Sequence, residues 1–589
     1  MDPAASVAKI RQIQAAFKVI AVLGLTAIHW PPSDFVTNGA SYDFVIVGAG
    51  SAGCVLANRL SENKQVNVLL IEAGGDPPFE SMVTIRLPGL ITFLPQTSYD
   101  WNYTAAFDKN RKYYQKDLVA PLTQGKMLGG SSSLNYMFYV RGNPQDYQAW
   151  AEVAKDESWK YENLLPYFKK SEYMEDPAIL KSKYKEFHGT NGFLHVSREP
   201  HSEVKDYFKM FEELGHDIIL DANGYETMGY NQPSYTIARS GVRQSTAFSF
   251  LRPVQHRKNL HVLKNTLVTK ILFDGSKNAV GIEALMANKK TITISANKEV
   301  IISAGGINSA KLLLQSGVGP AGHLKSLGIK VIADLPVGEN LQDHVAGIIA
   351  YKMKEAHDLP KPPNYSTFLL PMMMGYVALN KTDKQPTYQS VTLAVPNDSE
   401  GPLQFCAFGF ALDYDICQRT YEASKGREML YKTVILLHPK SRGVIQLKST
   451  DPLDPPLVFL NYFSDESDLD ILAKSLADCD ELRNSTYFKS VGGELVEFNL
   501  PKCQGLAVGS HEYWKCHALS TRASMFHYTG ACAMGSVLDE RLRVRGVQRL
   551  RVADSSAMPN ITSGNTNAPV IMLAEKAADM IKEDNECHD

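Results

Sequence analysis

The chain has 589 residues, of which 44% are hydrophobic and 21% are charged, a composition typical of a globular protein with a substantial core. Its length allows about two to four domains. The formal net charge is −2 and no basic run contains interleaved aromatic residues, so nothing in the sequence indicates a nucleic-acid-binding surface. The eight cysteines show neither C-x-x-C spacing nor a nearby histidine cluster, which argues against a metal site.

Residues 1–38 differ from the rest of the chain and are predicted to be a leader followed by a linker. Lys9, Arg11 and Lys18 precede the apolar run 19–28, which is too short to span a bilayer but suits the hydrophobic region of a secretory signal. An N-terminal amphipathic helix of the mature protein is the alternative. We therefore expect a secreted protein without a membrane span.

Cysteine and asparagine positions are compatible with export. Cys503 and Cys516 bracket a polar segment that a disulfide between them would close, and one or two disulfides suit a secreted protein. Six asparagines stand in N-x-S/T glycosylation sequences, which would also arise by chance in a chain of this length: Asn102, Asn364, Asn380, Asn397, Asn484 and Asn560.

The stretch 42–75 carries the clearest motif. An apolar run at 44–47 predicts a buried strand, and Gly48, Gly50 and Gly53 follow at G-x-G-x-x-G spacing before an apolar helical face. A second apolar run, 66–71, ends in Glu72, an acidic residue placed to accept both hydroxyls of a ribose. Strand, glycine turn, helix and terminal acid together predict a dinucleotide site, with FAD or NAD favoured over NADP.

A second glycine-rich run, GKMLGGSSSLN at 125–135, offers backbone amides and hydroxyls with little side-chain bulk. Apolar and aromatic residues flank it, which argues against a solvated linker. The dinucleotide unit together with this run resembles the glucose–methanol–choline (GMC) family of flavoprotein oxidoreductases. The resemblance continues through blocks at 303–319, 337–344, 526–535 and 551–581, and therefore covers almost the whole chain after the leader.

The resemblance implies that the cofactor is FAD and that residues from several separated segments bind it. Val268 is expected near the adenine, and Asp554 near the pyrophosphate and ribityl chain. The residues expected to bind FAD are Gly48, Gly50, Ser51, Ala52, Gly53, Glu72, Ala73, Trp101, Met127, Gly129, Gly130, Ser131, Asn135, Val268, Asp554, Asn565 and Thr566.

The expected fold class is α/β, with a Rossmann-like FAD-binding domain and a second α+β substrate domain built on a mostly antiparallel sheet. Segment 39–343 is assigned to the FAD-binding domain with inserted substrate-domain pieces, 344–545 to the substrate domain, and 546–589 to the completion of the FAD-binding domain. A Met-rich stretch around Met372 to Met374 is interpreted as plain core or, alternatively, as the wall of an apolar pocket.

Oxidation of an alcohol removes a proton from oxygen and a hydride from carbon, and a neutral histidine suits the first task. By resemblance His527 is the catalytic base, and Asn565 is the second active-site residue that hydrogen-bonds the substrate oxygen. Asn567 lies two residues further on and is the competitor for that role. The sequence Tyr528 to Gly535 departs from the commonest text of the family, so the pocket near the base differs and the substrate of a well-known relative is not a safe guide by itself.

The predicted function is FAD-dependent oxidation of an alcohol to a carbonyl by hydride transfer to flavin N5. The resemblance is strongest to the insect branch of glucose dehydrogenases and ecdysone oxidases, and an apolar second domain favours a bulky secondary alcohol such as an ecdysteroid over a sugar. Oxygen and a quinone both remain open as the electron acceptor. The alternatives from other classes are a hydroxynitrile-type lyase and a flavin-binding protein without catalysis.

Overall fold

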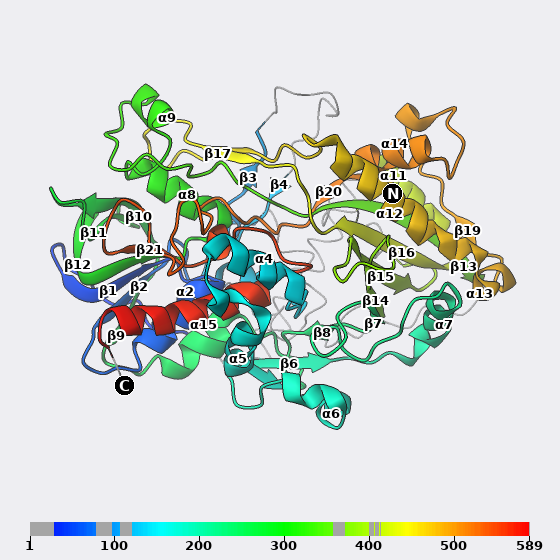
Figure 1. Ribbon diagram of the computed structural model, residues 1–589, viewed down its shortest axis with the longest axis horizontal. Helices are drawn as coiled ribbons and strands as arrows, with labels where there is room; N and C mark the ends of the chain where they lie inside the picture. The colour runs from blue at the N-terminus through cyan, green and yellow to red at the C-terminus, as the bar shows by residue number, and fades with distance from the viewer. Residues whose placement is uncertain are drawn as a thin grey trace.

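The structure is a computed structural model, and it describes residues 29–77, 97–106, 121–356, 371–399, 406, 412 and 414–587. Most of the predicted leader and the acceptor Asn364 therefore lie outside the described residues. Figure 1 shows two lobes side by side, each built around its own sheet.

Five parallel strands form the centre of the first sheet, in the order β9-β2-β1-β12-β21. Numbered along the chain this is the order 3-2-1-4-5 of a Rossmann-like sheet. Continuous buried apolar runs explain the parallel arrangement, because both faces of such a sheet are covered. The strands are β1 (Ser41–Val47), β2 (Val68–Ile71), β9 (Leu260–Leu263), β12 (Thr291–Ile302) and β21 (Leu550–Val552).

An antiparallel ribbon of β10 (Thr266–Phe273) and β11 (Ala279–Met286) extends this sheet along the first half of β12. Helices α2 (Ser51–Leu60) and α15 (Asn567–Asp584) pack against each other, while α8 (Gly305–Gln315) packs near β10 (Figure 1). The α/β fold, the predicted helix over 305–315 and the return of the chain end to this sheet are confirmed.

The second sheet is antiparallel throughout, in the order β19-β13-β16-β15-β14-β7, with β20 also paired to β13. It confirms the predicted antiparallel sheet of the second lobe. Its strands are β7 (Gly229–Asn231), β13 (Val345–Glu355), β14 (Met372–Val377), β15 (Tyr388–Val395), β16 (Arg427–Leu436), β19 (Glu494–Leu495) and β20 (Ala523–Ser524).

Side chains alternate between the two faces of this sheet, as the strand period requires. One face packs against α12 (Glu466–Asp480) and α14 (His511–Thr521), and the other belongs to a second apolar cluster. Met373 lies in the helix-covered cluster, whereas Met372 and Met374 lie in the other. The interpretation of Met372 to Met374 as one pocket wall is therefore wrong for Met373, because adjacent strand residues point in opposite directions.

The remaining elements connect or cover these two sheets (Figure 1). The strands are β3 (Tyr103–Thr104), β4 (Pro121–Leu122), β5 (Glu172–Met174), β6 (Leu194–Arg198), β8 (Ser234–Tyr235), β17 (Val444–Gln446) and β18 (Leu457–Phe459). The helices are α4 (Pro144–Ala154), α5 (Tyr161–Ser171), α6 (Pro177–Leu180), α7 (Lys205–Glu213), α9 (Ala321–Ser326), α11 (Tyr414–Ala423) and α13 (Thr486–Ser490).

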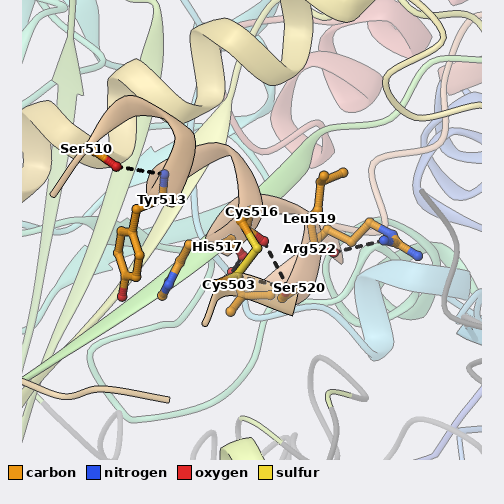
Figure 2. Close-up of a disulfide and its surroundings, with 9 residues drawn as sticks. Cys503, Ser510, Tyr513, Cys516, His517, Leu519, Ser520 and Arg522 are labelled. Carbon is orange, nitrogen blue, oxygen red and sulfur yellow. Dashed lines mark hydrogen bonds between the residues drawn. A yellow bond between two sulfur atoms is a disulfide. The ribbon is translucent and has the colours of Figure 1, made fainter. Parts of the chain in front are cut away.

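Two disulfides lie in the second lobe. Cys503 pairs with Cys516 of α14, as the sequence predicts, and Figure 2 shows this bond beside the second half of the helix. The neighbouring Ser520 hydroxyl donates to the Cys516 carbonyl at 2.9 Å. The second bond, Cys406–Cys417, was not predicted, and it ties position 406 to α11.

Candidate active site

One large cavity lies where the carboxyl ends of the parallel strands face the second sheet. A crevice at the carboxyl ends, where the strand order reverses between β1 and β12, is the general ligand site of such sheets. Thirteen of the predicted residues line it: Gly50, Ser51, Ala52, Glu72, Ala73, Trp101, Gly130, Ser131, Asn135, His527, Asp554, Asn565 and Thr566. Residues from positions 50 to 566 thus meet at one place.

Two helix N-termini open onto this cavity. Gly50, Ser51 and Ala52 at the start of α2, and Thr566 and Asn567 at the start of α15, all line it. Neither helix has an acidic residue in its first turn or a side-chain cap. Their unpaired N–H groups and positive dipole ends therefore favour an anion such as a pyrophosphate.

The glycines of the first motif have different tasks. A Cβ at Gly53 would lie 1.8 Å from the Gly48 carbonyl oxygen, and Gly48 itself has φ of +99°, so both keep helix and strand in close contact. A Cβ at Gly50 would meet protein only at 3.9 Å, at the Cα of Gly130. The protein therefore leaves the space in front of Gly50 open, which allows the pyrophosphate of a dinucleotide to approach the backbone closely.

Glu72 is buried at the end of β2, where two backbone amides hold its carboxylate. Ala49 N–H donates to one oxygen at 2.9 Å and Gly74 N–H to the other at 2.8 Å. Burial raises the pKa of Glu72 to about 7, although these hydrogen bonds oppose the shift. Each carboxylate oxygen keeps a second lone pair, so the side chain can still accept the hydroxyls of a ribose.

A smaller cavity continues from the first and shares Ala73, Trp101 and Ala304 with it. Val268 of β10 lines this second cavity, together with Leu312 and the polar residues of α8, which are Asn308, Lys311 and Gln315. Val268 is thus separated from the catalytic residues but lies along the same channel. An extended ligand such as a dinucleotide would need such an elongated site.

Four of the predicted cofactor residues are placed behind the cavity wall. Gly48 and Gly53 act in packing, Met127 is fully buried, and the Gly129 N–H donates to the Ala49 carbonyl at 2.7 Å. The lining residue Asp554 also has a local task. Its carboxylate accepts hydrogen bonds from Gly305 N–H at 2.8 Å and from Ser556 N–H at 2.8 Å, so it fixes the start of α8.

His527 lies in the cavity wall at the centre of a chain of hydrogen bonds. Its Nε2 lies 3.1 Å from Asn565 Nδ2, and its Nδ1 lies 2.9 Å from Nδ1 of His344. The other nitrogen of His344, Nε2, lies 3.1 Å from the Leu437 carbonyl oxygen. Asn567 contacts Ser51 instead, through its Oδ1 at 2.8 Å, so Asn565 is the asparagine next to the histidine.

The Leu437 carbonyl determines the proton positions in this chain. A carbonyl only accepts, so His344 carries its proton on Nε2 and accepts on Nδ1 when neutral. His527 must then donate from Nδ1, which leaves its Nε2 without a proton and facing Asn565. The nitrogen that borders the cavity is therefore a free base.

Burial also keeps both histidines neutral. It lowers the pKa of His527 from 6.5 to about 3 and lowers the pKa of His344 well below the same starting value. Both side chains are almost inaccessible, with 8% and 0% of their surface exposed. A neutral imidazole at working pH can accept the proton of an alcohol.

Sequence reasoning missed two neighbours of His527, which are Asp343 and His344. Asp343 accepts a hydrogen bond from the His527 backbone N–H at 2.7 Å and another from the Ser524 hydroxyl at 2.6 Å. Burial raises the pKa of Asp343 to about 6. In the sequence, the block 337–344 indicates the family but no role for Asp343 or His344. An adjacent Asp and His directly before an apolar strand was the available signal, since this places both at a strand end.

The backbone turn at Phe526 helps to fix the position of His527. Phe526, the residue before His527, has φ of +60°, a conformation that bulky residues rarely adopt. Non-glycine residues in this region cost of order 1–3 kcal/mol and cluster at functional sites. Asp343 and Ser524 hold this turn through the hydrogen bonds of the His527 and Phe526 amides.

The part of the cavity beyond His527 is largely apolar. The second sheet contributes side chains from three adjacent strands, and the loop after the Gly/Ser run contributes aromatic residues. These lining residues are Leu134, Tyr136, Met137, Phe138, Met372, Val391, Leu393, Tyr431, Thr433, Ile435, Met525 and Phe526. A bulky apolar molecule therefore fits this half better than a small polyol.

Within the described residues, no group of three or more His, Cys, Asp or Glu side chains is arranged to hold a metal ion. A search of the same residues for a helix long and apolar enough to cross a membrane also finds none.

Comparison with known proteins gives matches over most of the chain. Two GMC oxidoreductase family models match residues 42–346 and 439–574. The chain is similar to an ecdysone oxidase of Spodoptera littoralis, at 39% identity over 94% of this chain and 93% of the relative. It is also similar to a glucose dehydrogenase [FAD, quinone] of Drosophila melanogaster, at 36% identity over 92% of this chain and 87% of the relative.

Solved structures agree with the sequence comparison. A mutant formate oxidase of Aspergillus oryzae superposes with a TM-score of 0.79 at 27% identity, over 94% of this chain and 100% of that one. A pyridoxine 4-oxidase from Mesorbium loti gives a TM-score of 0.76 at 27% identity, over 93% of this chain and 100% of that one.

Proposed function

This chain belongs to the GMC oxidoreductase family of FAD-dependent enzymes that act on alcohols, and we propose that its substrate is a bulky, apolar secondary alcohol such as an ecdysteroid. One observation carries this proposal: a neutral histidine with an unprotonated Nε2 borders a cavity whose far half is apolar. The relatives named ecdysone oxidases support the same substrate class.

The residues present fit FAD. The open space at Gly50, the start of α2 and the start of α15 suit its pyrophosphate, and Glu72 suits its ribose. Val268 and the second cavity suit its adenine. When bound, FAD supplies a hydride acceptor at N5.

The protein residues then divide the remaining work. His527 Nε2 accepts the hydroxyl proton, and Nδ1–H keeps its hydrogen bond to His344, which holds the imidazole ring in place. Asn565 presents its Nδ2 to the histidine, and no described residue hydrogen-bonds its buried Oδ1. The amide nitrogen carries a second N–H, which can donate to the substrate oxygen and stabilise the negative charge that develops there.

The apolar half of the cavity distinguishes the proposed substrate from a sugar. Met372, Val391 and Leu393 on the second sheet offer no hydrogen bond to the many hydroxyls of glucose, and each buried hydroxyl without a partner costs about 1–3 kcal/mol. Glucose remains the competing substrate because the glucose dehydrogenase relatives cover nearly as much of the chain.

The acceptor and the location follow from the same relatives. Relatives named oxidases and relatives named quinone dehydrogenases both match, so oxygen and a quinone are the two acceptors to compare. The disulfides Cys406–Cys417 and Cys503–Cys516 support secretion, because such bonds persist in oxidising compartments.

Anaerobic mixing of the flavin-loaded protein with an alcohol tests the proposal through the loss of the oxidised flavin spectrum. We expect faster reduction by a steroid alcohol than by glucose. A tenfold higher kcat/KM for glucose, about 1.4 kcal/mol of discrimination, would reject the substrate class. Bound flavin that no alcohol reduces would instead indicate a lyase or a binding protein.

A further inference from the structure

The phenol of Tyr431 is an unpaired polar group inside the apolar half of the cavity. Its side chain lines the cavity from β16 and only 1% of its surface is exposed. No described residue hydrogen-bonds its hydroxyl. Burial raises its pKa far above that of a free phenol, so the hydroxyl stays neutral and can both donate and accept.

The two strand partners of Tyr431 have apolar side chains, which cannot replace the hydrogen bonds that its hydroxyl would make with water. The phenol of Tyr136 also lines the cavity and lies near enough to help raise the pKa of Tyr431. Leu393 is its direct partner on β15, and Ala350 is its partner on β13. A buried hydroxyl without a hydrogen bond is costly, and a phenylalanine would fill the same space without that cost. A tyrosine at this position is therefore explained by a polar group that arrives with a ligand.

The register of β16 places this hydroxyl far from the reacting atoms. Tyr431, Thr433 and Ile435 line the cavity from alternate positions of the strand, and Leu437, which anchors His344, follows directly after it. Six residues of extended chain separate Tyr431 from Leu437, a distance of about 20 Å between their Cα atoms. The phenol and His527 therefore mark two ends of an elongated site.

We propose that Tyr431 is a specificity-determining residue that hydrogen-bonds a second polar group of the substrate, remote from the hydroxyl that is oxidised. The proposal rests on the proposed function and narrows it to elongated apolar alcohols with a hydroxyl or keto group at the far end. After allowing for the lengths of both side chains, the two polar groups lie on the order of 10 to 20 Å apart. A single hexose ring cannot span this separation.

Two alcohols and one substitution test this role. The substrates are a steroid with one hydroxyl on its first ring and the matching diol with a second hydroxyl on its last ring. We expect wild-type enzyme to prefer the diol in kcat/KM for flavin reduction. Tyr431→Phe should lower kcat/KM for the diol by roughly 5- to 150-fold, the equivalent of one buried hydrogen bond, and leave the one-hydroxyl steroid within about threefold.

Tyr388→Phe is the matched control, because Tyr388 is equally buried in the same sheet but faces the helix-covered side, where its hydroxyl donates to Asp478 at 2.5 Å. This control should leave the preference for the diol unchanged. The melting temperature gives an independent readout: substrate-free Tyr431→Phe should melt at or above the wild-type temperature, since it removes an unpaired buried hydroxyl, whereas Tyr388→Phe should melt lower.

The outcomes separate this inference from the proposed function. If both steroids reduce the flavin and Tyr431→Phe changes their kcat/KM equally, the role of Tyr431 is overturned while alcohol oxidation stands; a buried water as the sole partner of the phenol would give this result. If neither steroid reduces bound flavin, the proposed substrate class and the role of Tyr431 are both overturned.

Discussion

Replacement of His344 by phenylalanine tests how the protein keeps His527 in its basic form. Phenylalanine preserves a planar ring but removes the acceptor that lies 2.9 Å from His527 Nδ1 and the donor that lies 3.1 Å from the Leu437 carbonyl. His527 would then lose the hydrogen bond that selects its tautomer. The variant should retain flavin, because the hydrogen bonds of the His344 side chain go to His527 and Leu437 and not to either FAD-binding helix.

The magnitude follows from one unmade buried hydrogen bond, about 1–3 kcal/mol, which corresponds to a roughly 5- to 150-fold smaller fraction of the productive tautomer. The rate of flavin reduction should fall by the same factor. Two groups are left unpaired, so the free energy of unfolding should also fall by about 1–3 kcal/mol for each.

Stopped-flow reduction under anaerobic conditions, normalised to bound flavin, gives the rate. His344→Gln is the control, since its amide offers both an acceptor and a donor and should recover much of the activity. A His344→Phe variant that reduces its flavin within twofold of the wild-type rate would refute the tautomer argument.

Three further predictions concern the cofactor, the pH profile and the disulfide. Gly50→Val should give folded protein with little flavin, because the space before Gly50 is open to the cavity, whereas Gly53→Val should fail to fold; circular dichroism and flavin absorbance distinguish the two. Because burial lowers the pKa of His527 to about 3, flavin reduction should show no step from His527 between pH 5 and 9, and a step there that is lost in His527→Ala would contradict the buried environment. His527 has a pKa of 6.5 in the unfolded chain and about 3 in the folded protein, so the unfolded chain takes up the proton first as the pH falls. The free energy of unfolding should therefore decrease between about pH 6.5 and 3. Replacing Cys503 and Cys516 by serine should lower the free energy of unfolding by about 3 kcal/mol, as expected for a loop of this length, without changing the rate per bound flavin; an unchanged melting temperature would show that the bond does not contribute.

Local patterns were sufficient to predict the first sheet. The apolar run before Gly48, the glycine spacing and the acid at position 72 each depend on residues close together in the chain, and the structure has strand, helix and strand there. The helix over 305–315 and the final strand and helix also followed from local apolar patterns. These elements are determined by short-range sequence, so the α/β class could be read from them.

The contacts of His527 could not be predicted in the same way. His344 and His527 are separated by 183 residues, and their contact requires β13 and β20 to pair in one particular register. No local sequence pattern indicates the register in which these two strands pair. Family resemblance identified His527 and Asn565 as candidates. The hydrogen-bond chain from His527 through His344 to Leu437 depends on how the strands of the second sheet pair, so it could be found only in the structure.

The Met-rich stretch is buried, as its interpretation as core predicts, but the face that each methionine occupies did not follow from composition. Composition treated Met372, Met373 and Met374 as one feature, whereas the strand sends Met373 to the helix-covered face and leaves Met372 in the cavity wall. The period of two would have separated them once the segment was assigned to a strand.

The central claim is that His527 is the base that accepts the alcohol proton, and one measurement tests it most directly: the rate of flavin reduction in His527→Ala, normalised to bound flavin. His517→Ala is the matched control, because His517 is another buried histidine whose pKa is lowered, to about 4, and it hydrogen-bonds the Ile348 carbonyl outside the cavity wall. The account predicts a roughly 10²- to 10⁴-fold slower rate for His527→Ala and a near wild-type rate for His517→Ala. An unchanged rate per bound flavin in His527→Ala would contradict the assignment.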